Sequence, residues 1–138
     1  MKTLSIRQPW AWCITDCGKP IENRSWYTSY RGPILLHASK GMTLTEYYDF
    51  YNEVMGGRVD FSYEVLRRHQ DIPEPKALLR GGIVGIADIV DCVKESNSPW
   101  FFGPWGFVLE NVRPLKLFPC KGALGFFDVD VDPERLAA

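Results

Sequence analysis

The chain has 138 residues, of which 46% are hydrophobic and 24% are charged, a composition typical of a packed globular protein without long disordered tails. Its 16 lysines and arginines and 17 aspartates and glutamates give a net charge of −1, which excludes the large positive field that drives tight, sequence-independent binding to long duplexes. Its apolar runs are too short to cross a bilayer, and the N-terminus has no signal-peptide pattern. We expect one domain over residues 1–138, monomeric and cytoplasmic, with no membrane contact.

The first part of the chain predicts three strands and one helix. A short strand over residues 4–7 precedes Pro9, which we place at the first position of a helix that Gly18 ends. Polar and apolar residues alternate over residues 21–26 as in a half-exposed strand, and a turn leads into an apolar strand over residues 34–38.

The middle of the chain predicts helices. Thr43 and Glu46 have the spacing of a capping box, and the aromatic residues that follow repeat at helical spacing as far as Gly56. A second helix is expected over about residues 62–69. We therefore expect a helical insert over about residues 41–79.

Strand patterns dominate the remainder. Residues 83–93 are nearly continuous in β-branched and apolar side chains, residues 106–112 and 114–118 flank an expected bulge, and residues 125–131 alternate. Strands therefore occur at both ends of the chain with helices between them. We expect an α+β fold, a mixed and partly closed β-barrel around one core.

Lys19, Glu22 and Arg24 form a charged group just after the predicted first helix. Side chains two apart on a strand share a face, so Glu22 and Arg24 should point the same way with Lys19 leaning over them from the preceding turn. Arg24 can hold a phosphate, Lys19 can supply a point charge or act as a base, and Glu22 can shuttle a proton. The alternative is a solvated ion-pair strip on an edge strand. We expect Lys19 to be exposed, so that truncating it costs little stability.

Aromatic residues are interleaved with arginines in the same segment. Tryptophan and tyrosine rings can stack on bases while arginines pair with phosphate. We expect at least one of Trp10 and Trp12 to lie in the core, and Trp26 is the better candidate for a stacking surface. The residues of this group are Arg7, Trp10, Trp12, Arg24, Trp26, Tyr27, Tyr30 and Arg31.

A second aromatic cluster, residues 98–106, is too apolar to be left in water. It either caps one end of the barrel or forms a wall of the ligand cleft, and in the second case Trp105 is a cleft residue. Asn111 follows at the end of a strand, where its amide could read a base edge.

The histidines and cysteines predict no metal site. We interpret His37, in an apolar run, as a hydrogen-bonded core residue and His69 as exposed. Cys13 and Cys17 share a helix face, but no histidine lies nearby to complete a metal site, so we interpret them as small buried hydrophobes with reduced thiols. We expect no metal and no cofactor.

The N-terminal residues resemble the ASCH domain family (activating signal cointegrator homology), part of the wider PUA-like superfamily. The resemblance rests on LSIRQPWAWCI at residues 4–14, on SWYTSYRG at residues 25–32 and on the GxKxxExR signature between them. Lys19, Glu22 and Arg24 keep the spacing of the signature, whereas its glycine directly precedes Lys19 here instead of standing one residue earlier. The likeness covers most of the chain except the helical insert.

The resemblance implies a PUA-like β-barrel with a cleft for nucleic acid or a nucleotide. Members of the family are described as RNA or DNA binders, as ribonucleases and, in one branch, as an amidohydrolase of acetylated cytidine. That branch is similar in its lysine but has a threonine at the position of Glu22. A likeness of fold does not select among these functions.

Our first hypothesis is a module that binds RNA, single-stranded nucleic acid or a modified nucleoside in a cationic and aromatic cleft. The second is a hydrolase, either a ribonuclease or an amidohydrolase, with Lys19 and Glu22 as its catalytic residues. The third is a protein-interaction domain whose exposed aromatics dock a partner. The side chains predicted to contact nucleic acid are Arg7, Lys19, Glu22, Arg24, Trp26, Tyr30, Arg31, Trp105 and Asn111.

Overall fold

The computed structural model describes residues 1–56 and 72–138. The second predicted helix, over residues 62–69, and His69 lie outside these residues. The strands of the described part are β1 (Lys2–Ile6), β2 (Ile21–Arg24), β3 (Gly32–Ala38), β4 (Gly82–Val93), β5 (Trp105–Pro119) and β6 (Phe126–Asp128). The helices are α1 (Trp10–Cys17), α2 (Leu44–Gly56) and the 3₁₀ turns η1 (Pro75–Ala77) and η2 (Pro133–Leu136).

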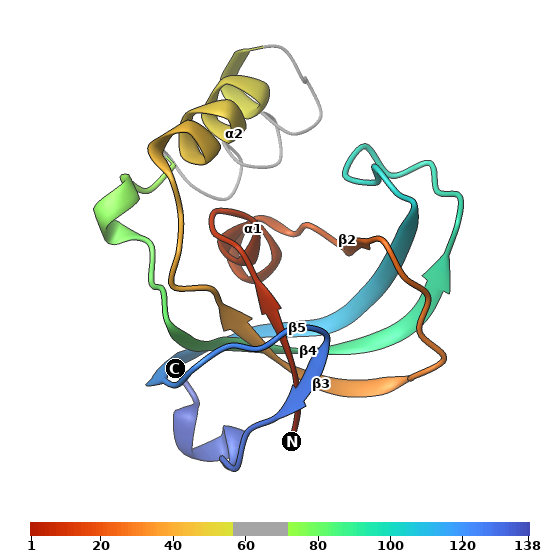
Figure 1. Cartoon of the computed structure of the whole chain (residues 1–138), viewed down its shortest axis with the longest axis vertical. Helices are drawn as coiled ribbons and strands as arrows, with labels where there is room; N and C mark the ends of the chain where they lie inside the picture. Colours follow the sequence, from red (N-terminus) through yellow and green to blue (C-terminus); the bar gives the residue numbers. More distant parts are fainter. Residues whose placement is uncertain (57–71) are drawn as a thin grey trace.

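Within the described residues, the six strands form one mixed sheet in the order β2-β5-β4-β3-β1-β6. β1 runs parallel to β3, and the other neighbours are antiparallel. The long strands β4 and β5 curve around one side of α1 (Figure 1), and the two edge strands, β2 and β6, do not pair with each other. The predicted α+β fold with a partly closed barrel is confirmed.

A bulge bends β5 at Asn111 and Val112, directly before the position where the sequence predicted one. Asp88 of β4 pairs with Glu110 and Ile86 pairs with Arg113, so two residues of β5 lie opposite one residue of β4. Asn111, inside the bulge, has a φ of 54°. Bulges increase the local twist of a strand, and here the bulge lies within one continuous strand, β5, instead of between two.

α1 is buried on most of its surface because it packs between the sheet and the segment that contains α2. The side chain of Ile14 in α1 joins the core of the sheet, whereas Trp12 and Cys13 pack in a second cluster with Phe50 of α2. Burial raises the pKa of the Cys13 thiol well above its usual range, with Cys17 adding to the shift. All four cysteines are free, and the interpretation of Cys13 and Cys17 as buried hydrophobes is confirmed.

Some boundaries differ from the prediction for local reasons. Pro9 occupies the N-cap of α1 instead of its first helical position. β2 ends at Arg24 because its partner strand begins directly opposite, at Trp105. The capping box at the start of α2 is confirmed, since the Glu46 N–H donates to Thr43 Oγ1 and the Thr43 N–H donates to Glu46 Oε1, each at 3.0 Å.

In the part of the chain that the structure describes, no helix has the length and apolar character needed to span a membrane.

Candidate functional site

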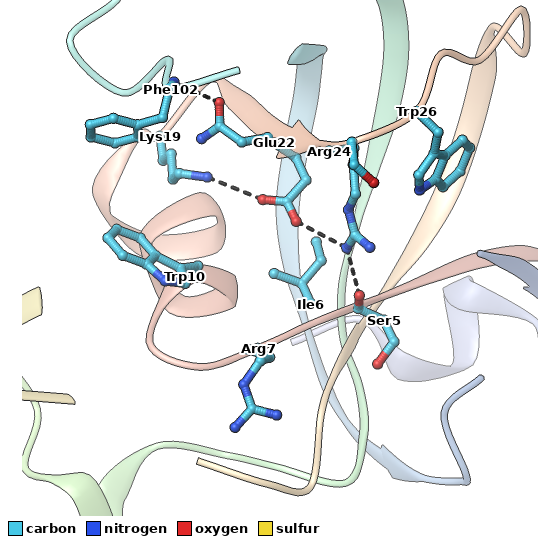
Figure 2. A pocket seen from close by; sticks show the side chains of 11 residues that line it. Ser5, Ile6, Arg7, Trp10, Lys19, Glu22, Arg24, Trp26 and Phe102 are labelled. Atoms are coloured by element: carbon cyan, nitrogen blue, oxygen red, sulfur yellow. Dashed lines mark hydrogen bonds and ion pairs between the residues drawn. The ribbon is translucent and has the colours of Figure 1, made fainter. Parts of the chain in front are cut away.

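A pocket of about 470 Å³, here called the cleft, opens between the β1–α1 junction, β2 and the loop that follows β4. β1 and the residues after it contribute Ser5, Ile6, Arg7 and Trp10. The helix end and β2 contribute Lys19, Glu22, Asn23 and Arg24, followed by Ser25 and Trp26, and the loop contributes Phe102. Figure 2 shows these side chains around the cleft.

Lys19 is placed in the cleft by the end of α1. Gly18 takes a left-handed φ of 77°, and the Lys19 N–H donates to the carbonyl of Cys13 at 3.0 Å, which turns the chain sharply after the helix. The residue that follows this turn is buried: Lys19 is only 2% exposed. The prediction of an exposed Lys19 was therefore wrong, and its ammonium group lies 5.6 Å from the centre of the Trp10 ring.

Glu22 lies between two cations on the floor of the cleft. Lys19 Nζ donates to Glu22 Oε1 at 3.2 Å, and Arg24 Nη2 donates to Glu22 Oε2 at 3.0 Å (Figure 2). Arg24 Nη2 also donates to the carbonyl of Ser5 at 2.6 Å, which ties β2 to β1 across the cleft. The prediction that Glu22 and Arg24 share a face is confirmed, and we call these three side chains the Lys19–Glu22–Arg24 cluster.

The cluster carries an uncompensated positive charge. Two cations share one carboxylate, and buried charges are stable only when they are paired and hydrogen-bonded. The Nε of Arg24 is buried and has no hydrogen-bond partner among the described residues. The Arg24 side chain as a whole stays 20% exposed and lines the cleft, so an anion in the cleft can contact it. The site therefore favours an anion.

Arg7 adds a further cation at the rim of the cleft. Its guanidinium pairs with the carboxylate of Glu46 through two hydrogen bonds of 2.5 and 2.6 Å, and both side chains are more than a third exposed. Hydrogen bonds from Arg7, followed by those from Thr43, lower the pKa of Glu46 to about 2. This pair joins the rim to the first turn of α2.

Three aromatic rings form the walls. Trp10 and Phe102 lie at the Lys19 end of the cleft, and Trp26 lies beyond Arg24 (Figure 2). Trp26 is half-buried because its ring packs edge-to-face against Phe107 and Phe126, at centroid distances of 5.1 and 5.3 Å. Of Trp10 and Trp12, it is Trp12 that is buried in the core, which confirms the prediction that at least one of them would be. Rings in these positions can stack on a base while the floor holds its phosphate.

The loop after β4 both caps the core and forms a wall of the cleft. Trp100 is buried in the cluster beside α1, whereas Phe102 is half-exposed and lines the cleft. Asn23 positions the loop: its amide donates to the carbonyl of Trp100 at 3.0 Å and its side-chain oxygen accepts from the Phe102 N–H at 2.8 Å. Both predicted roles of residues 98–106 are thus present, on different residues.

Four residues predicted to contact nucleic acid lie outside the lining of the cleft. Tyr30 donates to the carbonyl of Pro33 at 2.7 Å, and Arg31 donates to the carbonyl of Thr28 at 2.9 Å. The Trp105 ring packs against Tyr27 at 5.0 Å, and the Asn111 amide donates to Asp88 at 2.8 Å. The structure does bring together the other predicted residues, Arg7, Lys19, Glu22, Arg24 and Trp26.

Sequence reasoning did not identify the roles of Ser5 and Asn23. Asn23 lies between Glu22 and Arg24 on β2, so strand alternation separates it from the face that they share, and its side chain holds the loop at the Phe102 end of the cleft. Alternation could have identified it. Ser5 contributes its backbone carbonyl to Arg24, a role that no side-chain pattern records.

His37 is a buried, hydrogen-bonded residue, as predicted. Its Nε2 lies 2.9 Å from the carbonyl of Cys120 and its Nδ1 lies 2.9 Å from Ser5 Oγ. A carbonyl can only accept, so Nε2 carries a proton and donates to Cys120. The described residues contain no group of three or more His, Cys, Asp or Glu side chains placed to hold a metal ion.

Comparisons with known proteins agree with this architecture. The family model described as "ASCH domain" matches residues 4–115. The chain is 28% identical over 128 residues to activating signal cointegrator 1 of Homo sapiens and 30% identical to that of Mus musculus. Each match covers 86% of this chain and 20% of the relative, so the chain spans about a fifth of the length of these relatives. The chain belongs to the ASCH domain family.

Proposed function

We propose that the cleft binds a nucleotide of single-stranded RNA, with the phosphate on the Lys19–Glu22–Arg24 cluster and the base against the aromatic walls. The observation that carries this proposal is the cluster itself: the buried Lys19 and the partly buried Arg24 share one carboxylate, that of Glu22. The cluster thus offers an anion one excess positive charge. Arginine suits this role because its planar fork matches the oxygens of a phosphate.

The aromatic walls make a nucleotide a better fit than a small anion. Trp10, Trp26 and Phe102 surround the same pocket, whose volume of about 470 Å³ falls within the usual range for small-molecule sites. Base stacking on such rings is tolerant of sequence and is worth about 1–3 kcal/mol per base. Single-stranded substrates present their bases for this contact, whereas duplexes hide them.

The overall charge favours a local contact with the nucleic acid. The chain has a net charge of −1, yet the cleft is lined by three cations and one carboxylate. Binding through such a site engages few phosphates and is correspondingly less sensitive to salt than binding along a duplex. Membership of the ASCH domain family supports nucleic acid as the ligand class. The four free thiols fit a reducing compartment, and we place the protein in the cytoplasm as a monomer.

Hydrolysis in the same cleft is a second candidate because Lys19 and Glu22 form a buried pair at 3.2 Å. A ribonuclease would use Lys19 to stabilise the charge that develops on the phosphorus oxygens, and Glu22 to move a proton. An amidohydrolase acting on acetylated cytidine would use the same lysine, although Glu22 stands where that branch of the family has a threonine.

The test is titration of a fluorescein-labelled octaribonucleotide of random sequence into the wild type and Lys19→Met, with the RNA run on a gel afterwards. Methionine keeps the buried stem, and Glu22 keeps its bond to Arg24, so the variant should remain folded. Lys116→Met, an exposed lysine on β5, is the matched control.

We expect wild type and control to bind intact RNA equally. Lys19→Met should bind more weakly, with a salt slope smaller by about 0.7 because one phosphate contact is lost. RNA cleavage that disappears in Lys19→Met would identify a ribonuclease instead. Equal binding by all three proteins, or none by any, would refute the proposed use of the cleft.

A further inference from the structure

A second pocket lies on the other side of β1 and is strongly basic. It has a volume of about 660 Å³, and Lys40, Arg80 and Lys121 line it. None of its lining residues, all within the described part of the chain, is acidic. We call it the basic pocket. In a chain with a net charge of −1, three cations gathered without a carboxylate mark a place where an anion is favoured.

The basic pocket is held in shape by hydrogen bonds between three separate segments. The Gly81 N–H donates to the carbonyl of Ala38 at 2.8 Å, and the Cys120 N–H donates to the carbonyl of Gly81 at 3.1 Å. Arg80 Nη1 donates to the carbonyl of Lys40 at 3.1 Å. The ends of β3 and β5 and the start of β4 are thereby joined, so the three cations are brought together before any ligand arrives.

His37 and Gly122 fix the floor of the basic pocket. His37 Nε2 donates to the carbonyl of Cys120, which holds the segment after β5 against β3. Gly122 packs so closely on this point that a Cβ there would lie 2.8 Å from His37 Cε1 and 3.0 Å from Ser5 Oγ. Only glycine therefore fits at position 122, and its neighbour Lys121 lines the basic pocket.

Ser5 separates the basic pocket from the cleft and lines both. Its carbonyl accepts from Arg24 on the cleft side, and its hydroxyl bonds to His37 and Ser39 on the other side. The Arg7 guanidinium lies beside the residue that follows Lys40, because a Cβ on Gly41 would lie 3.5 Å from Nη1 of Arg7. Figure 2 shows Ser5 and Arg7 at the β1 edge of the cleft.

We propose that the basic pocket binds the phosphate of a second nucleotide, adjacent in the strand to the nucleotide in the cleft. This inference rests on the proposed function of the cleft and defines its substrate class: a single strand of at least two nucleotides, which crosses the β1 edge at Ser5, and not a free nucleoside or mononucleotide. Arg7 lies between the two positions, and a passing phosphate competes with Glu46 for its guanidinium.

The test compares the double variant Lys40→Gln/Lys121→Gln with the control Lys76→Gln/Lys116→Gln. All four lysines are exposed, and the two variants change the net charge equally. The probes are the labelled random octaribonucleotide and, as competitor, an equimolar mixture of the four ribonucleoside 5′-monophosphates. Thermal melting checks that both variants fold as the wild type does.

At 0.15 M salt we expect the basic-pocket variant to bind the octaribonucleotide roughly tenfold more weakly than the control, with a salt slope smaller by about 1.4, since two phosphate contacts are lost. Mononucleotide affinity, which depends on the cleft alone, should be the same in both variants. Equal octaribonucleotide binding by both variants, or mononucleotides that bind the wild type as tightly as the octaribonucleotide, would overturn the second site and leave the cleft standing. Failure of the wild type to bind either probe would overturn the proposed function, and this inference with it.

Discussion

Replacing Glu22 with glutamine tests two consequences of the carboxylate that Lys19 and Arg24 share: its contribution to the stability of the fold and its effect on anion binding. Glutamine has the same shape, but it has no charge and one of its two terminal atoms is a donor. It can accept from Lys19 or from Arg24, and its amide group then faces the other cation. The change therefore leaves one buried and one partly buried cation close together without a counter-charge.

Removing one partner of a buried ion pair typically costs about 3–5 kcal/mol. The total stability of a domain is about 5–15 kcal/mol, so the loss is a large fraction of it. For a chain of this length, we expect the melting temperature to fall by roughly 10–20 °C. Glu110→Gln, on the exposed side of β5, is the matched control and should melt near the wild-type temperature.

The same variant should respond more strongly to anions. Glu22→Gln leaves the cluster with two uncompensated cations, so added inorganic phosphate should raise its melting temperature more than that of the wild type. Differential scanning fluorimetry across a phosphate series measures both effects. A Glu22→Gln protein that melts within about 2 °C of Glu110→Gln and shows no extra response to phosphate would refute the description of the cluster as a buried, anion-seeking site.

Three further predictions concern the walls, the rim and the basic pocket. Trp26→Ala should weaken octaribonucleotide binding by about 1–3 kcal/mol if the ring stacks on a base, measured by fluorescence anisotropy on protein whose folding has been checked by melting. The depressed pKa of Glu46 means that its pairing with Arg7 stabilises the fold above the ordinary value of 4.5 and is lost as the pH falls toward about 2, so the stability gap between wild type and Glu46→Gln should narrow over that range. Gly122→Ala should lower the melting temperature, because its Cβ would meet the His37 ring at 2.8 Å, whereas Ala123→Ser beside it should not.

The sequence predicts those parts of the fold that short-range chemistry decides. The capping box of Thr43 and Glu46, the end of the first helix at Gly18 and a bulge in the long last strands each depend on neighbouring residues, and all three are present. Strand alternation likewise predicts that Glu22 and Arg24 share a face, and they do. Spacing alone is sufficient for these features.

The burial of Lys19 follows from tertiary contacts that spacing does not contain. The residue follows a helix end, a position that is normally exposed, but here Phe102 and Trp10 enclose it at one end of the cleft (Figure 2). Phe102 reaches that position because Asn23 binds a loop about eighty residues further along the chain. The alternative of a solvated ion-pair strip was therefore wrong, because tertiary contacts bury Lys19 and Glu22.

The basic pocket could not be predicted from the sequence at all. Lys40, Arg80 and Lys121 are far apart in the chain and belong to no motif. They meet because β3, β4 and β5 are neighbours in the sheet and their ends are joined by backbone hydrogen bonds. Organisation as a single domain with a helical insert stays a prediction, as do the binding roles of Tyr30, Arg31, Trp105 and Asn111.

The indole N–H signals of the five tryptophans can show whether RNA binds in the cleft, since each reports on a known place in the fold. In a ¹⁵N-labelled sample titrated with the octaribonucleotide, we expect the signals of Trp10 and Trp26, which line the cleft, to shift and saturate together. Trp100, buried behind the loop, and Trp105, packed on Tyr27, serve as internal references and should move little. Shifts confined to Trp105, or no shift of Trp10 and Trp26 while RNA binds, would show that the RNA binds outside the cleft.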